Sequence, residues 1–339
     1  MESEHASSQE GLPPQGSEAS PERPEAGVAT AGGAGDAPLE RVPPCVPRTL
    51  GDFNQCRELL DMIKFEHTVF ALPFAFLGVL AASPVLPSWS TLGWVLAAMV
   101  GARTAAMTFN RLVDEDLDAE NPRTRGRALP AGRVGRGGAW VLLGISTALF
   151  GFAAGMLGPL PWELAPLALL VILGYSLCKR VTSLSHAVLG LALAGAPLGG
   201  WIVAVGRVDP PAWYLALGVL AWTAGFDVLY ALQDEGFDRS RGLCSIPARL
   251  GASRALWVSR AFHVGALLSW AVFNAMLGCH LLPWLAWLGV ALLLLREHWV
   301  LRGGNLDRID HAFFNLNSLV GPLFFLGHFV EWLLVRPLA

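Results

Sequence analysis

The sequence predicts an all-α integral membrane protein in which nine transmembrane helices surround a central cavity. Of its 339 residues, 53% are hydrophobic and only 15% are charged, whereas soluble domains carry about 25% charged residues. Apolar segments of about 17–23 residues, each long enough to cross a bilayer, alternate with short polar breaks. Two acidic motifs follow two of these segments on one side of the membrane, so we expect a shared cavity between them.

Residues 1–50 differ in composition from the rest of the chain. They are rich in Gly, Ala, Pro, Glu and Ser and contain no long apolar run, which predicts a disordered tail. A regulatory or docking role is one alternative, but a dispensable tail is favoured. No basic n-region precedes an apolar h-region here, so we expect no cleavable signal. The transmembrane domain is expected over residues 55–338.

Nine apolar spans follow in order, each bounded by a polar break. Pro73, Pro166 and Pro197 fall inside spans and should kink them. Small residues gathered at positions 190–200 should let helices pack closely. The spans are residues 67–83, 91–113, 138–157, 163–180, 184–205, 212–233, 255–277, 281–301 and 313–335.

The polar breaks alternate in positive charge. Fourteen Lys and Arg residues lie at or just after the ends of the second, fourth, sixth and eighth spans. The other breaks between spans contain only Arg207. The positive-inside rule therefore places the N-terminus and the Arg-rich loops in the cytoplasm and the C-terminus outside. Both acidic motifs then face the cytoplasm, and a bacterial inner (plasma) membrane is the expected location.

The first acidic motif, Asn110, Asp114 and Asp118, lies at the end of the second span. On a helix, each step of four residues turns by about 40°, so the three side chains should fan over about 80° of one helix end. Arginines gather at residues 123–136, and this mixture suits a divalent metal beside a phosphate-bearing ligand. A solvated cap is the alternative. A calcium loop is excluded because its sixth position is Ala and its twelfth is Arg.

The second motif, Asp234 and Asp238, repeats the spacing after the sixth span and is followed by Arg239 and Arg241. Its importance comes from the pairing of the two motifs on one side of the membrane. Because carboxylates repel phosphate, an anionic ligand must arrive with cations. Mg²⁺ takes one or two carboxylates and binds substrate phosphates at its remaining positions. Two acidic motifs therefore fit two magnesium ions bridged by a diphosphate.

Two more charged residues lie deeper in the predicted helices. Asp227 precedes Asp234 by seven residues and Arg103 precedes Asn110 by seven, which places each about 10 Å further into the membrane. A charged Asp at mid-helix costs about 2.5–3.5 kcal/mol on insertion scales, so Asp227 needs a partner or a polar cavity. In a structural role, Asp227 forms an ion pair, for which Arg103 is a candidate, or it is a protonated, hydrogen-bonded acid. In a functional role, the two residues line an acceptor pocket in which Arg103 holds a carboxylate or phosphate.

Tyr175 and Lys179 lie four residues apart at the cytoplasmic end of the fourth span. In one interpretation the lysine only extends to the membrane surface. In the other it faces the cavity and neutralises a leaving diphosphate.

Together these residues resemble the UbiA prenyltransferase family of intramembrane enzymes, over roughly residues 55–335. That family has nine transmembrane helices and two Asp-rich cytoplasmic motifs. Its first motif, Asn-Asp-x-x-Asp-x-x-x-Asp, is matched by Asn110, Asp114 and Asp118, with Arg111 in place of the first Asp.

The other points of resemblance are spread along the chain. They are Asp234 and Asp238 for the family's Asp-x-x-x-Asp motif, RALPAG at 127–132, SIPARLG at 245–251, and Tyr175 and Lys179 for its diphosphate-contacting Tyr-x-x-x-Lys element.

Within the family, the sequence is similar to a subgroup called 4-hydroxybenzoate polyprenyltransferase-like. In bacteria this subgroup includes MqnP, the prenyltransferase of the futalosine route to menaquinone, which implies a dihydroxynaphthoate acceptor rather than 4-hydroxybenzoate. The similarity lies in IKFEHTVFALPFAF at 63–76, GARTAAMTFNRLVDEDLDAENPRT at 101–124 and GFDVLYALQDEGFD at 225–238.

The resemblance implies Mg²⁺-dependent transfer of a polyprenyl group from polyprenyl diphosphate to an aromatic acid. The motif residues would hold two Mg²⁺ on the diphosphate, with Lys179 and Arg127 adding positive charge. Arg103 would hold the acceptor's carboxylate, and Asp227 would orient a hydroxyl or take a proton. The aromatic side chains expected to stabilise the allylic cation are Phe109, Phe226, Tyr230 and Phe237.

Other classes of protein are alternatives to this interpretation. They are a 4-hydroxybenzoate polyprenyltransferase of ubiquinone biosynthesis, a non-catalytic membrane scaffold and a transporter. Transporters place ionisable groups near the midplane of repeated halves, whereas here the acids gather at one face and nine spans do not divide equally. The expected partners are the lipid bilayer, polyprenyl diphosphate and an aromatic acid, without nucleic acid.

Overall fold

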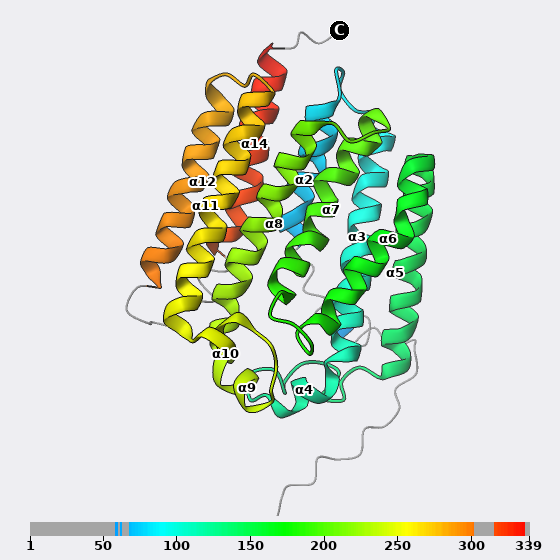
Figure 1. Ribbon diagram of the computed structural model, residues 1–339. Helices are drawn as coiled ribbons and strands as arrows, with labels where there is room; N and C mark the ends of the chain where they lie inside the picture. Colours follow the sequence, from blue (N-terminus) through cyan, green and yellow to red (C-terminus); the bar gives the residue numbers. More distant parts are fainter. Residues whose placement is uncertain (1–57, 60–61, 63–67, 302–314, 336–339) are drawn as a thin grey trace, which may run out of the picture. The chain divides into compact units, whose positions relative to one another are not determined.

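The computed structural model describes residues 58–59, 62, 68–301 and 315–335. The chain divides into two compact units, Met1–Pro44 and Cys45–Ala339, and every described residue belongs to the second. The predicted tail at residues 1–50 lies outside the described residues, and the domain boundaries at 55 and 338 stay predictions. The second unit is a bundle of long helices (Figure 1).

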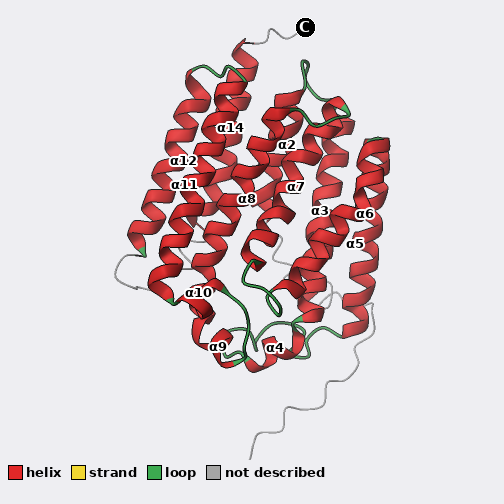
Figure 2. Cartoon of the chain, viewed as in Figure 1, coloured by secondary structure: helices red, strands yellow, loops and turns green. Residues whose placement is uncertain are grey.

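All regular structure in the described part of the chain is helical (Figure 2). The long helices are α2 (Thr68–Ala82), α3 (Trp89–Val113), α5 (Arg136–Leu157), α6 (Pro159–Cys178), α7 (Ser185–Val205), α8 (Pro210–Tyr230), α11 (Ala252–Met276), α12 (Leu281–Val300) and α14 (Asn317–Val335). Short helices join some of them at the lower end of the bundle in Figure 1: α4 (Glu115–Glu120), η2 (Ala231–Asp234), α9 (Glu235–Ser240) and α10 (Ile246–Leu250).

The predicted fold class, an all-α membrane protein, is confirmed. Among the described residues, eight helices are long and apolar enough to cross a membrane. The first predicted span, residues 67–83, corresponds to α2, which is apolar but only 15 residues long as described, so its crossing stays a prediction. Pro73, Pro166 and Pro197 lie inside α2, α6 and α7 as expected.

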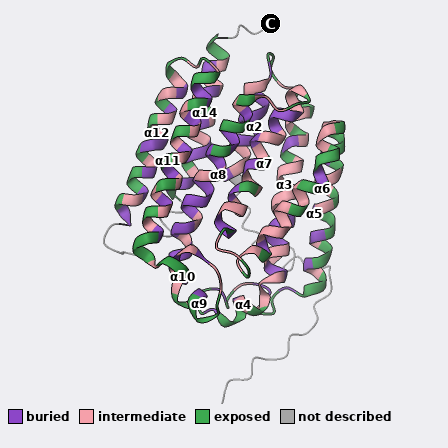
Figure 3. Cartoon of the chain, in the orientation of Figure 1, coloured by how far each residue is buried: buried purple, intermediate pink, exposed green. Residues whose placement is uncertain are grey.

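Helix α8 lies at the centre of the packing. In its most apolar window 72% of residues are buried, compared with 11% in α6, and buried positions run along much of its length in Figure 3. Trp222 on α8 packs against Phe74 of α2 and Trp270 of α11, and Phe74 stacks on Trp270 with ring centroids 5.4 Å apart. This aromatic core fixes α8, which carries Asp227 into the bundle.

Glycines bring α7 close to its neighbours, as the small-residue segment at 190–200 predicted. A Cβ at Gly200 would lie 2.1 Å from the carbonyl oxygen of Ala75 on α2, and one at Gly190 would lie 2.4 Å from the carbonyl oxygen of Leu220 on α8. Such contacts between backbones are characteristic of small residues in membrane helices. They leave α2, α7 and α8 as one tightly packed group.

The two acidic motifs do not continue regular helices, and this corrects the sequence-based prediction. Helix α3 ends at Val113, and Asp114 has φ −94° and ψ 8° before α4 begins. In the second motif, the 3-10 helix η2 separates α8 from α9. The three residues of the first motif therefore do not fan along one straight helix. Each break turns the chain across the end of the bundle, so both motifs border the same space.

Candidate active site

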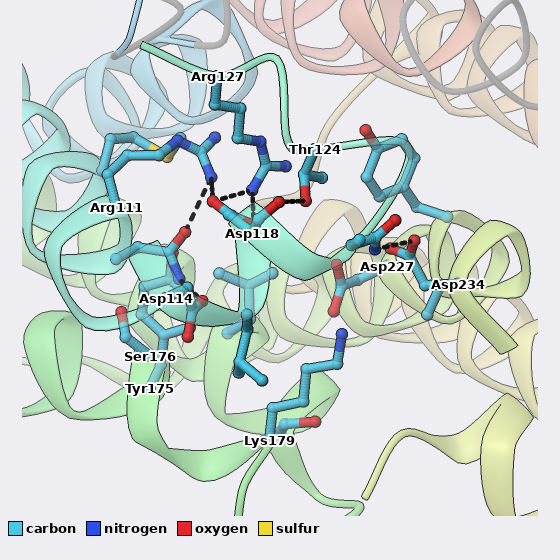
Figure 4. A pocket seen from close by; sticks show the side chains of 18 of the residues that line it. Arg111, Asp114, Asp118, Thr124, Arg127, Tyr175, Ser176, Lys179, Asp227 and Asp234 are labelled. Atoms are coloured by element: carbon cyan, nitrogen blue, oxygen red, sulfur yellow. Dashed lines mark hydrogen bonds and ion pairs between the residues drawn. The ribbon is translucent and has the colours of Figure 1, made fainter. Parts of the chain in front are cut away.

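A cavity of about 650 Å³ opens at the end of the bundle where the short helices lie. Nine of the ten predicted site residues line it: Arg103, Asn110, Asp114, Asp118, Arg127, Tyr175, Lys179, Asp227 and Asp234. Figure 4 shows all of these except Arg103 and Asn110 as labelled side chains. The tenth, Asp238, is fully buried and is not part of the lining. The prediction that the chain brings the two motifs face to face therefore holds for four of the five motif residues.

The first motif is held together by its own hydrogen bonds. The amide of Asn110 donates to Oδ2 of Asp114 at 2.9 Å. Arg180, at the end of α6, donates to Oδ1 of Asp114 at 3.2 Å and to the carbonyl oxygen of Val113 at 2.6 Å. Burial raises the pKa of Asp114, and the hydrogen bond from Arg180 opposes this shift. Arg180 thus ties α6 to the point where α3 ends.

Asp118 accepts hydrogen bonds from Arg127 and forms a longer ion pair with Arg111. Nη1 of Arg127 lies 2.6 and 2.7 Å from its two carboxylate oxygens. Nη1 of Arg111 lies 3.8 Å from Oδ2 of Asp118 and donates to Oδ1 of Asn110 at 3.3 Å. Figure 4 shows both guanidinium groups directed at Asp118. Arg111, the departure from the family motif, therefore places a buried positive charge between two motif residues.

The second motif contacts the loop that follows the first. Arg123 donates from Nε to Oδ1 of Asp234 at 3.0 Å and from Nη2 to Oδ2, and Asn121 donates to Oδ1 at 2.9 Å. Arg123 also donates to the hydroxyl of Tyr230 at 3.1 Å, with its guanidinium over the ring. A bidentate arginine–carboxylate pair is geometrically specific, so it fixes the loop after α4 against η2.

Asp238 is paired with Lys179. The lysine Nζ lies 2.8 Å from Oδ1 of Asp238, whose side chain is 0% exposed, and Lys179 itself is 38% exposed and lines the cavity. Tyr175, the other half of the predicted pair, is on α6 and also faces the cavity. Lys179 therefore lines the cavity while its ammonium group pairs with the buried carboxylate of Asp238, so it does not only extend to the membrane surface.

The residues of the two motifs fit Mg²⁺ in chemistry, because carboxylate and amide oxygens are the ligands it prefers. Buried Oδ2 of Asp238 has no hydrogen-bond donor among the described residues. No group of three acidic, His or Cys side chains that could hold an ion is assembled within the described residues. Asp114, Asp118, Asp234 and Asp238 each form an ion pair with a basic side chain, and all of them except Asp238 line the cavity.

The deeper part of the cavity separates Arg103 from Asp227. The proposed structural ion pair between them is absent from the described residues: Oδ2 of Asp227 lies 2.7 Å from Nδ1 of His186. Nε of Arg103 is buried and has no hydrogen-bond partner among the described residues. This geometry agrees with the alternative in which Arg103 and Asp227 both line a pocket.

Three of the four aromatic residues expected beside the cavity line it, namely Phe226, Tyr230 and Phe237. Phe109 does not, which corrects the expectation based on its closeness to Asn110 in the sequence. It packs instead against the apolar cluster of Leu112, Leu143 and their neighbours. On a helix, adjacent residues point about 100° apart, so closeness in sequence places Phe109 on another face.

Several contacts of the site were not identified from the sequence. Arg123 was counted only as one arginine in a run, and Arg180 was counted only for membrane orientation. Asn121 follows Asp118 by three residues, a weak signal that an amide borders the motif. His186 stands beside the start of the predicted span 184–205 and had no signal in the local sequence, because its partners, Asp227 and Ile246, lie 41 and 60 residues away.

The fold and this cavity define a multi-pass membrane protein with a charge-lined site at one end of its helix bundle. The profile of the UbiA prenyltransferase family matches residues 71–319. The chain therefore belongs to this family and is one of its membrane prenyltransferases.

Relatives and solved structures agree with this membership. A 4-hydroxybenzoate octaprenyltransferase from Tolumonas auensis is 30% identical over 253 residues, covering 73% of this chain and 85% of the relative. One from Methylobacillus flagellatus is 32% identical over 256 residues, covering 74% and 84%. The apo structure of a UbiA homologue from Aeropyrum pernix aligns with a TM-score of 0.73 and 33% identity over 79% of this chain and 98% of that chain. A UbiA homologue from Archaeoglobus fulgidus, solved bound to DMAPP and Mg²⁺, shares the fold with a TM-score of 0.66 and 17% identity over 81% and 98%.

Proposed function

We propose that the protein transfers a polyprenyl group from polyprenyl diphosphate to an aromatic acid of quinone biosynthesis, with a dihydroxynaphthoate as the favoured acceptor. One observation carries the proposal. A single cavity joins a mouth lined by acids and bases to a deeper part that contains Arg103 and Asp227. The mouth suits an anionic head group with its metal ions, and the deeper part suits a small acid with a hydroxyl group.

The diphosphate binds at the mouth in this proposal. Asn110, Asp114, Asp118, Asp234 and Asp238 would hold two Mg²⁺, which when bound neutralise the diphosphate and the charge that develops as it leaves. Lys179 and Arg127 line the same cavity and donate to phosphate oxygens as the carbon–oxygen bond breaks. Tyr175 faces the same space. Each basic side chain then exchanges a carboxylate partner for a phosphate oxygen.

The prenyl group lies against the apolar and aromatic part of the lining. Burial contributes about 0.8 kcal/mol for each CH₂ group of the isoprenoid. Phe226, Tyr230 and Phe237 line the cavity in which the allylic cation forms, and a cation over a ring face is stabilised. The surrounding bundle keeps out water, which would otherwise capture the cation.

The acceptor binds between Arg103 and Asp227. Arg103 pairs with its carboxylate, which supplies a partner for the buried Nε that has none among the described residues. Asp227 accepts a hydrogen bond from a ring hydroxyl and orients the ring. The electron-rich ring carbon then forms a bond with the allylic carbon, the carbon–oxygen bond to diphosphate breaks, and the ring loses one proton, which Asp227 can accept.

The identity of the acceptor is the finer part of the proposal. The sequence similarity at residues 63–76, 101–124 and 225–238 favours the dihydroxynaphthoate. A second candidate, 4-hydroxybenzoate, is supported by the names of the relatives from Tolumonas auensis and Methylobacillus flagellatus. Both acceptors carry a carboxylate and a hydroxyl on an aromatic ring, so both suit Arg103 and Asp227. A bacterial inner membrane remains the proposed location, and the positive-inside distribution supports a site on its cytoplasmic side.

Incorporation of label from a radiolabelled polyprenyl diphosphate in isolated membranes tests the proposal. Dihydroxynaphthoate and 4-hydroxybenzoate are offered separately, each with Mg²⁺ and with EDTA. We expect product from dihydroxynaphthoate with Mg²⁺ and none with EDTA. Product from 4-hydroxybenzoate but not from dihydroxynaphthoate would assign the second candidate as the acceptor. Absence of both products from folded protein would contradict catalysis with an aromatic acid and favour a scaffold or transporter.

A further inference from the structure

His186 and Asp227 form a pair at the inner wall of the cavity. His186 is in the first turn of α7 and Asp227 is in the last turns of α8, and both line the cavity. Nδ1 of the imidazole lies 2.7 Å from Oδ2 of the carboxylate. The histidine side chain is only 4% exposed, whereas Asp227 is 26% exposed toward the cavity. Asp227 is therefore accessible from one side and held by His186 from the other.

The opposite side of the imidazole fixes its tautomer. The backbone N–H of Ile246, at the start of α10, donates to Nε2 of His186 at 3.2 Å. A nitrogen that accepts a hydrogen bond carries a lone pair, so the ring proton of the neutral imidazole is on Nδ1. This assignment follows from the hydrogen-bond network. His186 consequently donates to Asp227, and α10 determines the direction of that donation.

The two carboxylate oxygens of Asp227 differ in their hydrogen bonding. Oδ2 accepts from His186, whereas Oδ1 accepts no hydrogen bond from any described residue. An ionised carboxylate in a membrane helix is costly unless donors surround it. The Nδ1–H group supplies such a donor without adding a second charge. The carboxylate of this cavity-lining residue therefore keeps one oxygen that no described residue occupies.

We propose that His186 is a positioning residue for the aromatic acceptor: it holds Asp227 so that Oδ1 faces the acceptor's hydroxyl. The inference rests on the function proposed above, because the hydroxyl belongs to the aromatic acid. The class of acceptor it specifies is a hydroxyaryl carboxylate, with the carboxylate at Arg103 and the hydroxyl at Asp227. A further consequence is that α10, outside the cavity lining, influences acceptor binding through the amide of Ile246.

A series of variants at His186 separates its two hydrogen bonds. Asn places an N–H donor near the position of Nδ1, so H186N keeps the bond to Asp227. Leu removes both bonds. We expect H186L to lower kcat/KM for the acceptor by about 10- to 100-fold, the loss expected when a charged group loses one hydrogen bond, and H186N to recover most of it. KM for polyprenyl diphosphate and the Mg²⁺ dependence should stay unchanged in both variants.

A double-mutant cycle tests whether His186 acts through Asp227. If it does, H186L adds little to the loss already caused by D227N. The matched control is H280Q, because the His280 side chain is 70% exposed and contacts Glu331, away from the cavity lining. Equal losses in H186N and H186L, an unchanged H186L enzyme, or full additivity with D227N would each overturn the inference.

A spectroscopic measurement keeps the inference separate from the proposed function. Imidazole ¹⁵N shifts in the purified protein, with His186 assigned by its loss in H186N, should show the Nδ1–H tautomer, and D227N should shift that signal. The opposite tautomer, or a signal that D227N leaves unmoved, would overturn the pairing whether or not the wild-type protein turns over. If the ¹⁵N signals are as expected but no aromatic product forms, the proposed function and the role of His186 in acceptor binding are contradicted. The His186–Asp227 pair itself would still be established.

Discussion

Arg123 and Asp234 are 111 residues apart in the sequence, yet Nε of the arginine lies 3.0 Å from Oδ1 of the carboxylate and Nη2 contacts the other oxygen. The pair joins the loop after α4 to η2, and therefore joins the two acidic motifs. Asn121 from the same loop donates to the same carboxylate at 2.9 Å. One side chain of the second motif is thus positioned by two residues that follow the first.

We expect R123A to lower kcat/KM for polyprenyl diphosphate by about 10- to 100-fold, because Asp234 loses a charge-assisted, bidentate partner. R123K should recover only part of the activity, since an ammonium group cannot reproduce the planar fork. Initial rates over a range of diphosphate concentrations measure the effect. R125A is the matched control, because Arg125 is exposed and lies outside the cavity lining. Equal rates for R123A and R125A would contradict a positioning role for Arg123.

Loss of either motif should remove metal-dependent turnover. D114A and D234A each delete one carboxylate that lines the cavity, so we expect product formation to fall to the level seen with EDTA while the protein stays inserted in the membrane. Product formation and membrane fractionation are measured on the same preparations. D116A is the control, because Asp116 is exposed and lies between motif residues without lining the cavity. Normal activity in both D114A and D234A would end the metal assignment.

The contribution of Lys179 to stability can be separated from its contribution to activity. K179M leaves the fully buried carboxylate of Asp238 without its ion-pair partner, and breaking such a pair costs about 3–5 kcal/mol when both groups are buried. Because Lys179 is 38% exposed, we expect a loss near the lower end, about 3 kcal/mol. The double variant K179M/D238N should recover most of the thermal stability but little activity. Recovery of both would show that the pair serves stability alone.

The sequence predicts the fold better than it predicts the site's pairings, for a physical reason. Apolar length and charge bias are local properties, so α3, α5, α6, α7, α8, α11, α12 and α14 match the predicted spans within a few residues. The chain breaks at Asp114 and at η2 were missed because spacing of four residues fits a continuous helix equally well.

The partners of the site residues depend on how distant segments meet. Arg103 was the one structural partner named for Asp227 from the sequence, but His186 is the residue that contacts it. Nothing in the order of residues near position 186 indicates this, because the contact arises where α7 begins beside α8. Composition and periodicity identify which residues face a polar space, whereas the tertiary fold decides which of them touch.

Arg103 should affect the acceptor and leave the donor unaffected. R103Q removes the positive charge whose Nε lacks a partner among the described residues, so we expect KM for the aromatic acid to rise by about tenfold or more. KM for polyprenyl diphosphate should change little, because Arg103 lies deeper than the motif residues. R103K should give an intermediate value, since it keeps the charge but not the fork. A rise in KM for the diphosphate instead would place Arg103 with the head group.

The last prediction concerns the close approach of α2 and α7 at Gly200. Gly200 and Gly199 are neighbours on α7, but a Cβ at Gly200 would lie 2.1 Å from the carbonyl oxygen of Ala75, whereas one at Gly199 has no atom within 4 Å. Backbone atoms cannot yield as a flexible side chain can, so G200A must separate the two helices.

We therefore expect G200A to lower the free energy of unfolding by about 1–3 kcal/mol, the range for inserting an extra methyl into a packed core. G199A should be neutral or slightly stabilising, because Ala favours a helix over Gly by up to about 1 kcal/mol. Thermal unfolding of the two purified variants in the same detergent gives the comparison. Because both substitutions add the same methyl group one position apart on the same helix, a difference between them reports the contact with α2. Equal Tm values would show that the two helices separate at no cost and that this contact does not contribute to stability.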